Sequence, residues 1–192
     1  MKRKQRRRRI AALGTLAVLI GVLAGALVAG GAFDDALQEL TLPLRHEDVI
    51  RQQADEKEVD AALIAAVIYS ESKFSDQESS AGARGLMQIT PEAAEYIEKR
   101  SGGTTFELSD LSDPELNIRY GTFLLRELLD RYDGDEAAAL AAYNAGPGNA
   151  DEWGGADLTV EDIGFPETRA YVEEVLEKRQ EYRGKYAKEL GY

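Results

Sequence analysis

The chain has 192 residues, of which 44% are hydrophobic and 30% charged, so it is long enough for one domain with a core and an appended segment. It has no cysteine and a single histidine, His46, which excludes a disulfide framework, a thiolate zinc site and a Ser-His-Asp triad. Nothing in the composition points to a metal or an organic cofactor.

Charge is distributed very unevenly along the chain. Residues 1–9 (MKRKQRRRR) hold seven of the 23 Lys and Arg residues, and no acidic residue precedes Asp34, so the remainder carries 16 basic against 35 acidic residues. A domain this acidic is poorly suited to nucleic acid, whose phosphates are bound mainly through basic side chains. We therefore expect no nucleic-acid partner.

Residues 10–33 form an uncharged stretch whose one polar side chain is Thr15. As a helix, this stretch would be roughly 36 Å long, enough to cross a hydrocarbon core of about 30 Å. The basic cluster at 1–9 is typical of a cytoplasmic segment, which would place residues 34 onward on the extracytoplasmic side. We interpret 10–33 as a transmembrane helix that anchors the protein to the cell membrane by a single pass.

The alternative is a signal peptide at 10–33, cleaved near Gly30, Gly31 and Ala32, which would give a secreted protein. Apolar cores of signal peptides are usually about 7 to 15 residues long, shorter than this one, so the anchor is favoured. Small residues recur every four positions at Ala17, Gly21, Gly25 and Ala29. That spacing would suit weak self-association through the helix, although small residues are common in membrane helices in general.

Residues 34–55 contain Pro43 and many charges, and we interpret them as a stalk or a first surface helix. Residues 56–192 are predicted to form a single domain that is mainly α-helical. From Val59 the pattern becomes helical, and either Asp55 or Asp60 would cap the start of this first helix. Nearly uniform apolarity from 61 to 69 indicates that this helix is central and buried.

Capping signals place the later helices. Thr90 with Pro91, and Asp113 with Pro114, each combine an N-cap residue with proline at the first helical position. A helix-breaking run, NAGPG, follows an alanine-rich stretch. No segment alternates with period two, so strands are limited to short hairpins. The predicted later helices start at 91 and span about 114–134, 135–143 and 167–188.

Glu71 closes the apolar helix and follows the residues Ala-Val-Ile-Tyr-Ser. Loss of water there disfavours the charged carboxylate and raises its pKa, and the partial negative charge at a helix C-terminus acts in the same direction. A carboxylic acid still protonated near neutral pH suits the general-acid step of glycosidic bond cleavage. Taken alone, however, Glu71 is more simply a solvated residue at a helix end.

Two loops strengthen the functional interpretation of Glu71. Residues 79–85 (SSAGARG) are mostly small, so a ligand can approach the backbone closely, and Leu-Met-Gln follows with an apolar surface beside an amide. Tyr143 and Asn144 place a phenol and a carboxamide where a later helix ends. Sugars need such surfaces, because their rings have apolar faces and polar edges.

Five sequence blocks together resemble the soluble-lytic-transglycosylase (SLT) domain family. They occur in the order of that family between residues 59 and about 183: ESxF at 71–74, SxxGAxGLMQ at 79–88, NIxxG at 117–121, AYNAG at 142–146 and ETRxYV at 167–172. The resemblance implies a globular, goose-type lysozyme-like helical fold. It also implies an enzyme that binds glycan strands of peptidoglycan and cleaves the β-1,4 bond between N-acetylmuramic acid and N-acetylglucosamine.

The resemblance implies a reaction with one carboxyl group. In the family, a glutamic acid protonates the leaving oxygen and its carboxylate then acts as base on the sugar's own 6-hydroxyl, leaving a 1,6-anhydromuramyl end. Glu71 matches that residue. Most other glycosidases use two carboxylates, and Asp76 or Glu78 would serve as the second in a hydrolytic muramidase. We interpret both as solvated. A non-catalytic cell-wall-binding module is a further alternative.

The matching blocks also supply expected substrate-binding residues. Ser79 would hydrogen-bond near Glu71 or to substrate, and Tyr143 with Asn144 would steady Glu71 or an N-acetyl group. Trp153 lies in a segment that resembles Gly-Asn-Val-x-x-Trp of the family, and it suits a sugar platform as well as a core or lid aromatic. The cleft wall would be completed by Met87, Gln88 and Tyr171.

Overall fold

The structure, a computed structural model, describes residues 25–26, 39–101 and 107–192. Residues 43–192 form a compact unit of their own. The basic segment 1–9 and, except for 25–26, the expected anchor at 10–33 lie outside the described residues. In the described ranges, no helix combines the length and the apolarity needed to cross a membrane.

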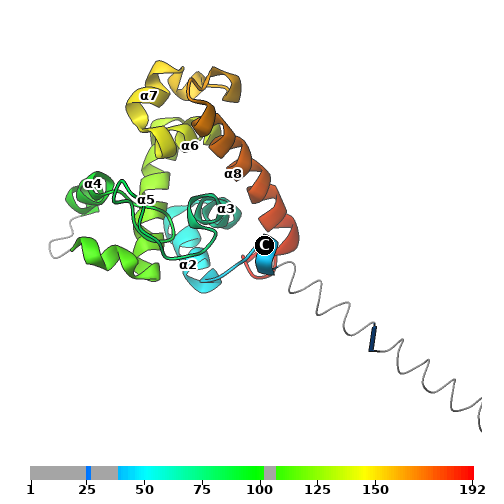
Figure 1. Ribbon diagram of the computed structural model, residues 1–192. Coiled ribbons are helices and arrows are strands. Elements are labelled where there is room, and N and C mark those ends of the chain that lie inside the picture. The colour runs from blue at the N-terminus through cyan, green and yellow to red at the C-terminus, as the bar shows by residue number, and fades with distance from the viewer. Residues whose placement is uncertain (1–24, 27–38, 102–106) are drawn as a thin grey trace, which may run out of the picture. The chain divides into compact units, whose positions relative to one another are not determined.

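The compact unit is mainly helical, as predicted (Figure 1). The β pairing found among the described residues consists of isolated bridges from Arg84 to Glu78 and to Ile89, which agrees with the expected limit to short hairpins. The helices are α2 (Glu47–Lys57), α3 (Ala61–Ser72), α4 (Pro91–Ser101), α5 (Pro114–Arg131), α6 (Glu136–Ala145), α7 (Pro147–Glu152) and α8 (Pro166–Lys185), with 3₁₀ turns at Leu108–Ser112, Gly155–Asp157 and Val160–Asp162.

The helices begin where their capping residues predict. The side chain of Asp60 accepts a hydrogen bond from the backbone N–H two residues later at 2.9 Å. Thr90 and Asp113 accept from the N–H three residues later, at 3.1 and 2.8 Å. Each cap satisfies a donor that has no partner within its own helix. Asp60 therefore starts α3, whereas Asp55 lies inside α2.

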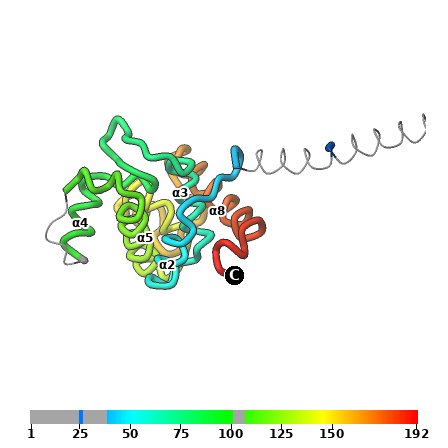
Figure 2. Tube along the Cα trace, turned by 90° about the horizontal axis from the view of Figure 1, so that it is seen from below, coloured from blue at the N-terminus to red at the C-terminus, as the bar shows by residue number. Residues whose placement is uncertain are grey.

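The helix α3 is buried at the centre of the unit, which confirms the prediction from its composition. Every residue from Ala61 to Ile68 is buried, so protein surrounds the helix on all sides. The long helix α8 packs along α3, and α2 and α5 pack against each other nearby (Figures 1 and 2). This packing fixes the helix whose last turn carries Glu71.

Two elements differ in extent from the sequence-based expectation. The helix α2 continues across the expected boundary between residues 55 and 56, and its Ile50 is fully buried, so the compact unit begins before residue 56. The expected break at 144–148 is confined to one turn-forming residue, Gly146, with a φ of 87°. Pro147 then starts α7 directly, because the first turn of a helix does not need the N–H that proline lacks.

Candidate active site

Glu71 lies in the last turn of α3 and is only partly exposed. Its loss of water raises the pKa of the carboxyl to about 7, and an interaction with the hydroxyl of Tyr171 lowers it by a smaller amount. The direction is the one that the apolar sequence before Glu71 predicts. At neutral pH, this carboxyl therefore retains its proton in a large fraction of molecules.

Two tyrosines from different helices lie near Glu71, namely Tyr143 of α6 and Tyr171 of α8. Burial, followed by the charge of Glu71, raises the pKa of both phenols well above their usual range, so both remain hydrogen-bond donors. The Tyr143 hydroxyl donates to the carbonyl oxygen of Met87 at 2.9 Å. The Tyr171 hydroxyl is buried without a hydrogen bond of ordinary geometry among the described residues, and its weaker interaction with Glu71 favours the carboxylate.

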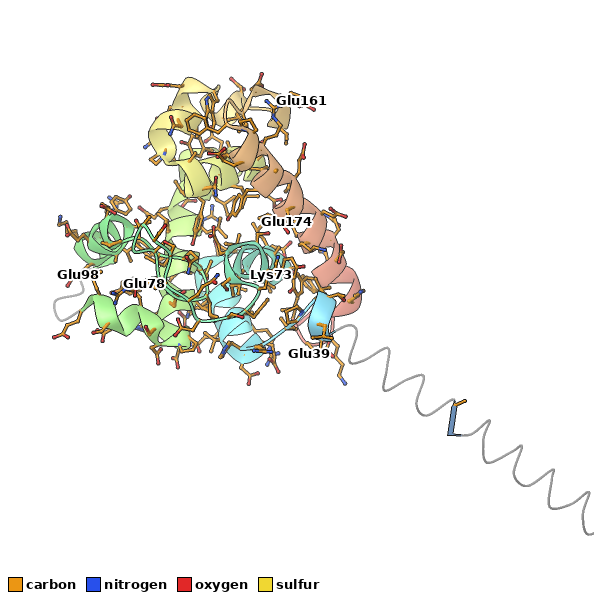
Figure 3. The ribbon with its side chains drawn as sticks, in the orientation of Figure 1. Glu39, Lys73, Glu78, Glu98, Glu161 and Glu174 are labelled. Atoms are coloured by element: carbon orange, nitrogen blue, oxygen red, sulfur yellow. The ribbon has the colours of Figure 1, made fainter. Side chains whose placement is uncertain are left out.

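The chain turns sharply directly after Glu71. Lys73 and Phe74 have φ values of 51° and 61°, in the left-handed region that residues other than glycine adopt only in small numbers. Phe74 is buried and its ring packs against Tyr182 of α8. Lys73 lies 3.9 Å from Glu174 of α8 (Figure 3). Both residues of the turn that ends α3 thus contact α8.

The loop of small residues is organised by its own polar groups. The Ser79 hydroxyl accepts a hydrogen bond from the backbone N–H of Ala83 at 3.1 Å. Gln88, whose φ is 48°, donates through its side-chain amide to the carbonyl oxygens of Gln77 and Gly85 at 3.0 and 2.9 Å. The structure therefore uses Ser79 and Gln88, both expected to contact substrate, to shape the loop itself.

Met87 occupies a different place from the expected cleft wall, because its side chain is fully buried. It packs against Gly121 of α5 so closely that a Cβ on that glycine would overlap its sulfur. Met87 contacts another candidate residue through its backbone, because its carbonyl oxygen accepts the hydrogen bond from Tyr143. Met87 thus links the loop to the core through its side chain and to α6 through its backbone.

Asn117 of α5 is a residue whose role sequence reasoning missed. It is fully buried, accepts from the Met87 N–H at 2.8 Å, and donates to the carbonyl oxygens of Arg84 and Leu111 at 2.9 and 3.0 Å. These bonds fasten the small-residue loop to α5. The feature of the sequence that indicates this role is an amide side chain on an otherwise apolar helix face, within the NIxxG block.

Asn144 is exposed at the end of α6, beside Tyr143. Its side-chain oxygen accepts a hydrogen bond of 2.7 Å from the hydroxyl of Thr168, in the first turn of α8. Thr168 was given no role from the sequence, although it lies in the ETRxYV block. The pair ties the end of α6 to the start of the helix that carries Tyr171.

Trp153 follows the last residue of α7, and the structure pairs it with another aromatic residue. Its ring meets Phe165 edge to face, with the ring centroids 5.0 Å apart, and lies against Gly164. Both aromatic residues are partly solvent-exposed, and Phe165 is 43% exposed. Trp153 therefore joins the two ends of segment 153–165.

A groove of about 730 Å³ opens beside Tyr143 and Asn144. Its lining residues come from α4, α5 and the turn from α6 to α7. Glu71 is not among the residues that line the groove, so Tyr143 connects the groove to the acid. The groove combines apolar and polar side chains, among them Ala93, Tyr96, Leu124, Glu127 and Pro147.

The two acids considered as second carboxylates lie on the loop after α3. Asp76 and Glu78 are both exposed, and Glu78 forms an ion pair with Arg84 at 3.1 Å (Figure 3). Neither shares the partly buried surroundings of Glu71. The chemistry that this arrangement offers is therefore proton donation and acceptance by one carboxyl, with two phenols beside it.

Comparisons with known proteins agree with this geometry. The family model described as the Transglycosylase SLT domain matches residues 48–163. A soluble lytic murein transglycosylase of Escherichia coli K12 is 34% identical over 167 residues, which cover 82% of this chain and 26% of the relative. The chain thus corresponds to about a quarter of the length of that relative.

Solved structures show the same fold. One is the lytic transglycosylase Slt of Pseudomonas aeruginosa, solved as an inactive mutant in which a glutamate is replaced by glutamine. It superposes with a TM-score of 0.73 and is 31% identical, and the match covers 78% of this chain and 26% of the Slt chain. A 70-kDa soluble lytic transglycosylase in complex with bulgecin A gives a TM-score of 0.72 at 32% identity, over 83% of this chain and 27% of its own. With more than half of its residues matched by the family model, this chain belongs to the Transglycosylase SLT domain family.

Proposed function

We propose that this chain is a peptidoglycan lytic transglycosylase in which Glu71 acts first as acid and then as base. One observation carries the proposal: Glu71 is a partly buried carboxyl whose pKa is raised to about 7, whereas the neighbouring Asp76 and Glu78 are exposed. A protonated carboxyl suits departure of an alkoxide, and a carboxylate suits the step that follows. A reaction that needs only one such group matches this arrangement.

In the proposed reaction, protonated Glu71 gives its proton to the glycosidic oxygen while the bond from that oxygen to C1 of N-acetylmuramic acid breaks. The Glu71 carboxylate then takes the proton of the 6-hydroxyl as that oxygen bonds to C1. The N-acetylglucosamine leaves with a free 4-hydroxyl and the muramyl end closes as a 1,6-anhydro ring. Glu71 ends with its proton regained, and no water is consumed.

Two residues support Glu71 in this proposal. The Tyr171 hydroxyl favours the carboxylate, so it would stabilise the state formed after the first proton transfer. Tyr143 lines the groove and hydrogen-bonds Met87, so it would hold the loop against the bound glycan. The remaining proposed substrate contacts are Asn144 at the groove, Ser79 and Gln88 on the loop, and Trp153 as a sugar platform.

The names of similar proteins support the proposal. The Escherichia coli relative is a soluble lytic murein transglycosylase, and the Pseudomonas aeruginosa protein was made inactive by exchanging one glutamate for glutamine. We propose that Glu71 has the corresponding place in this chain. We propose also that the groove beside Tyr143 admits glycan and bulgecin A, the ligand with which the 70-kDa enzyme was solved.

Digestion of purified peptidoglycan, followed by mass spectrometry of the released muropeptides, tests the proposal. We expect 1,6-anhydromuramyl ends with the wild type and no products with Glu71→Gln. The exchanges Asp76→Asn and Glu78→Gln, made together, remove the exposed acids and should leave the products unchanged. Reducing muramyl ends would instead establish a muramidase, and wall binding without products would establish a binding module.

We propose further that residues 10–33 anchor the enzyme in the cell membrane, with residues 34 onward on the extracytoplasmic side. The support is the length and apolarity of this stretch and the basic residues before it. Extraction of cell membranes with carbonate should leave the full chain in the membrane fraction. Recovery of a soluble chain that begins near residue 33 would establish signal-peptide cleavage instead.

A further inference from the structure

The helix α8 places one side chain between α3 and α6 at each of two levels. At the level of the candidate site, that residue is Tyr171, which lies near Glu71 of α3 and Tyr143 of α6. About two turns further along α8, Arg179 contacts the same two helices at their other ends. The three helices that carry the site are therefore joined twice through α8.

Arg179 bridges two carboxylates that belong to different helices. Its Nε donates to Oδ2 of Asp60 at 2.8 Å, and its Nη1 donates to Oε2 of Glu136 at 2.6 Å. Asp60 is the N-cap of α3, and Glu136 is the first residue of α6. The planar guanidinium holds its donors in a fixed fork, so the bridge fixes the two helix starts relative to each other.

The bridge is shielded from water more than an ordinary surface ion pair. The exposed fractions of the side chains are 20% for Arg179, 16% for Asp60 and 27% for Glu136. Burial raises the pKa of Asp60, but hydrogen bonds from Tyr192 and Arg179 outweigh burial and leave it below its ordinary value. Asp60 is therefore an anion at neutral pH. Burial raises the pKa of Glu136, the other carboxyl of the bridge, and the charge of Arg179 opposes that rise.

Distances along the helices connect the bridge to the site. At 1.5 Å per residue, Glu71 lies about 16 Å along α3 from Asp60, and Tyr143 lies about 10 Å along α6 from Glu136. Tyr171 lies about 12 Å along α8 from Arg179, in the opposite chain direction. A helix hardly stretches along its axis, so fixing the far ends sets how the near ends line up.

We propose that Arg179 is a positioning residue: by joining the starts of α3 and α6 through α8, it sets the axial register that places Glu71 beside Tyr143 and Tyr171. Its effect on catalysis rests on the proposed function. Its effect on the surroundings of Glu71 does not depend on that function, so the positioning role and the proposed function can be refuted separately.

Arg183 provides a matched control on the same helix. It lies one turn beyond Arg179 and also approaches Oδ2 of Asp60, at 3.5 Å, but its side chain is 52% exposed. Its other contact is with the ring of Tyr192, 4.8 Å from the ring centroid. Arg183→Gln therefore removes the same charge from α8 and one contact of Asp60, while the bridge to Glu136 remains.

The first measurement is the titration of the Glu71 carboxyl by ¹³C NMR in the folded wild type, Arg179→Gln and Arg183→Gln. The titratable groups that act on or are acted on by Glu71 are Tyr143 of α6 and Tyr171 of α8, and Tyr171 also feels the charge of Glu174. Lys73, two residues after Glu71, pairs with that same Glu174. Loss of register admits water at the end of α3, so the pKa of Glu71 in Arg179→Gln should fall from about 7 to about 6 or lower. In Arg183→Gln, which keeps the register and removes one cation, the pKa of Glu71 should not fall.

The sign of this change separates register from simple charge. Removal of a distant cation, with the helices unmoved, would raise the pKa of a carboxyl, because the attraction that favours its anion is lost. A pKa of Glu71 that rises or stays constant in folded Arg179→Gln therefore overturns the proposal. If Arg179→Gln does not fold, Arg179→Lys keeps the charge but not the fork, and loss of register is again expected to lower the pKa of Glu71; no change there is equally decisive against the proposal.

The second measurement is the kinetics of anhydromuramyl release. A small misplacement of reacting groups costs catalysis far more than binding, so Arg179→Gln should lose about tenfold or more in kcat with KM within about twofold. Arg179→Lys keeps the charge but not the fork, so we expect an intermediate kcat. A wild type without this activity would refute the proposed function, while the titration would still decide the role of Arg179.

Discussion

The hydroxyl of Tyr143 donates a hydrogen bond of 2.9 Å to the carbonyl oxygen of Met87, and this bond joins α6 to the small-residue loop beside Glu71. The two residues are 56 positions apart in the chain. The bond matters because the loop has no strand or helix of its own beyond isolated bridges among the described residues. Its shape therefore depends on contacts from α5 and α6 together with its own hydrogen bonds from Ser79 and Gln88.

Tyr143→Phe removes this bond and leaves the Met87 carbonyl without its partner. We expect a loss of about 1 kcal/mol in the free energy of unfolding, measured by denaturant titration. Hydrogen exchange of the amides at 79–89 should become faster. Tyr182→Phe is the control, because it removes a phenol bond of 2.6 Å to the carbonyl of Pro43 and should leave exchange in that loop unchanged. Equal exchange in the two variants would contradict the role of Tyr143.

Gly121→Ala tests the close contact between α5 and the Met87 side chain. The added Cβ overlaps the Met87 sulfur and can be accommodated only if the loop moves, so we expect a loss of about 1–3 kcal/mol in the free energy of unfolding. Gly184→Ala in α8 is the matched exchange, because nothing lies within 4 Å of its added Cβ. There the better helix propensity of alanine should give a gain of about 0.5–1 kcal/mol. Similar effects of the two exchanges would refute this account of the packing.

Asn117→Ala tests the amide that fastens the loop to α5. It removes three hydrogen bonds in a fully buried place and leaves backbone groups unpaired, so we expect a loss of about 3 kcal/mol or more in the free energy of unfolding. Asn149→Ala removes one bond, to the carbonyl of Ala145 at 2.7 Å, and should cost about 1 kcal/mol. Chemical denaturation of both variants compares them directly, and a smaller loss for Asn117→Ala would be inconsistent with this role.

The raised pKa of Glu71 predicts how stability depends on pH. The folded state keeps the proton up to about pH 7, whereas the unfolded chain releases it near 4.5, so ionisation of Glu71 lowers the free energy of unfolding as pH rises between these values. In Glu71→Gln, the side chain at position 71 is neutral at every pH, so the variant does not undergo this decrease in the free energy of unfolding. Its stability relative to wild type should be similar at pH 4 and greater by up to about 3 kcal/mol at pH 8. A difference that does not grow with pH would show that Glu71 titrates normally.

The same group predicts the pH dependence of activity. Because proton donation needs the protonated carboxyl, kcat/KM should fall as pH rises above about 7, the pKa of Glu71 in the free enzyme. Tyr171→Phe removes an interaction that lowers this pKa, so the decline should move to higher pH. Initial rates of anhydromuramyl release across pH 5–9 would detect this movement. A decline that moves to lower pH would mean that Tyr171 does not act on Glu71 as its position indicates.

Much of the local structure could be predicted from the sequence, because it depends on residues close together in the chain. Asp60, Thr90 and Asp113 cap their helices, since a short polar side chain needs only the N–H groups of the following turn. The burial of α3 follows from its continuous apolar run. The raised pKa of Glu71 follows in direction from that same run, which leaves its carboxyl little water.

Contacts between distant segments were decided by the tertiary structure alone. The Met87 side chain became part of the core because α5 offers a glycine at that point, 34 residues later in the chain. Arg179 joins residues 119 and 43 positions away, and no local pattern marks an arginine in an amphipathic helix as a bridge. The sequence by itself determined the helices and the character of the acid, through short-range hydrogen bonding and apolarity. Which side chains surround that acid was decided by the packing of α3, α6 and α8, because helix packing brings together residues that the chain keeps far apart.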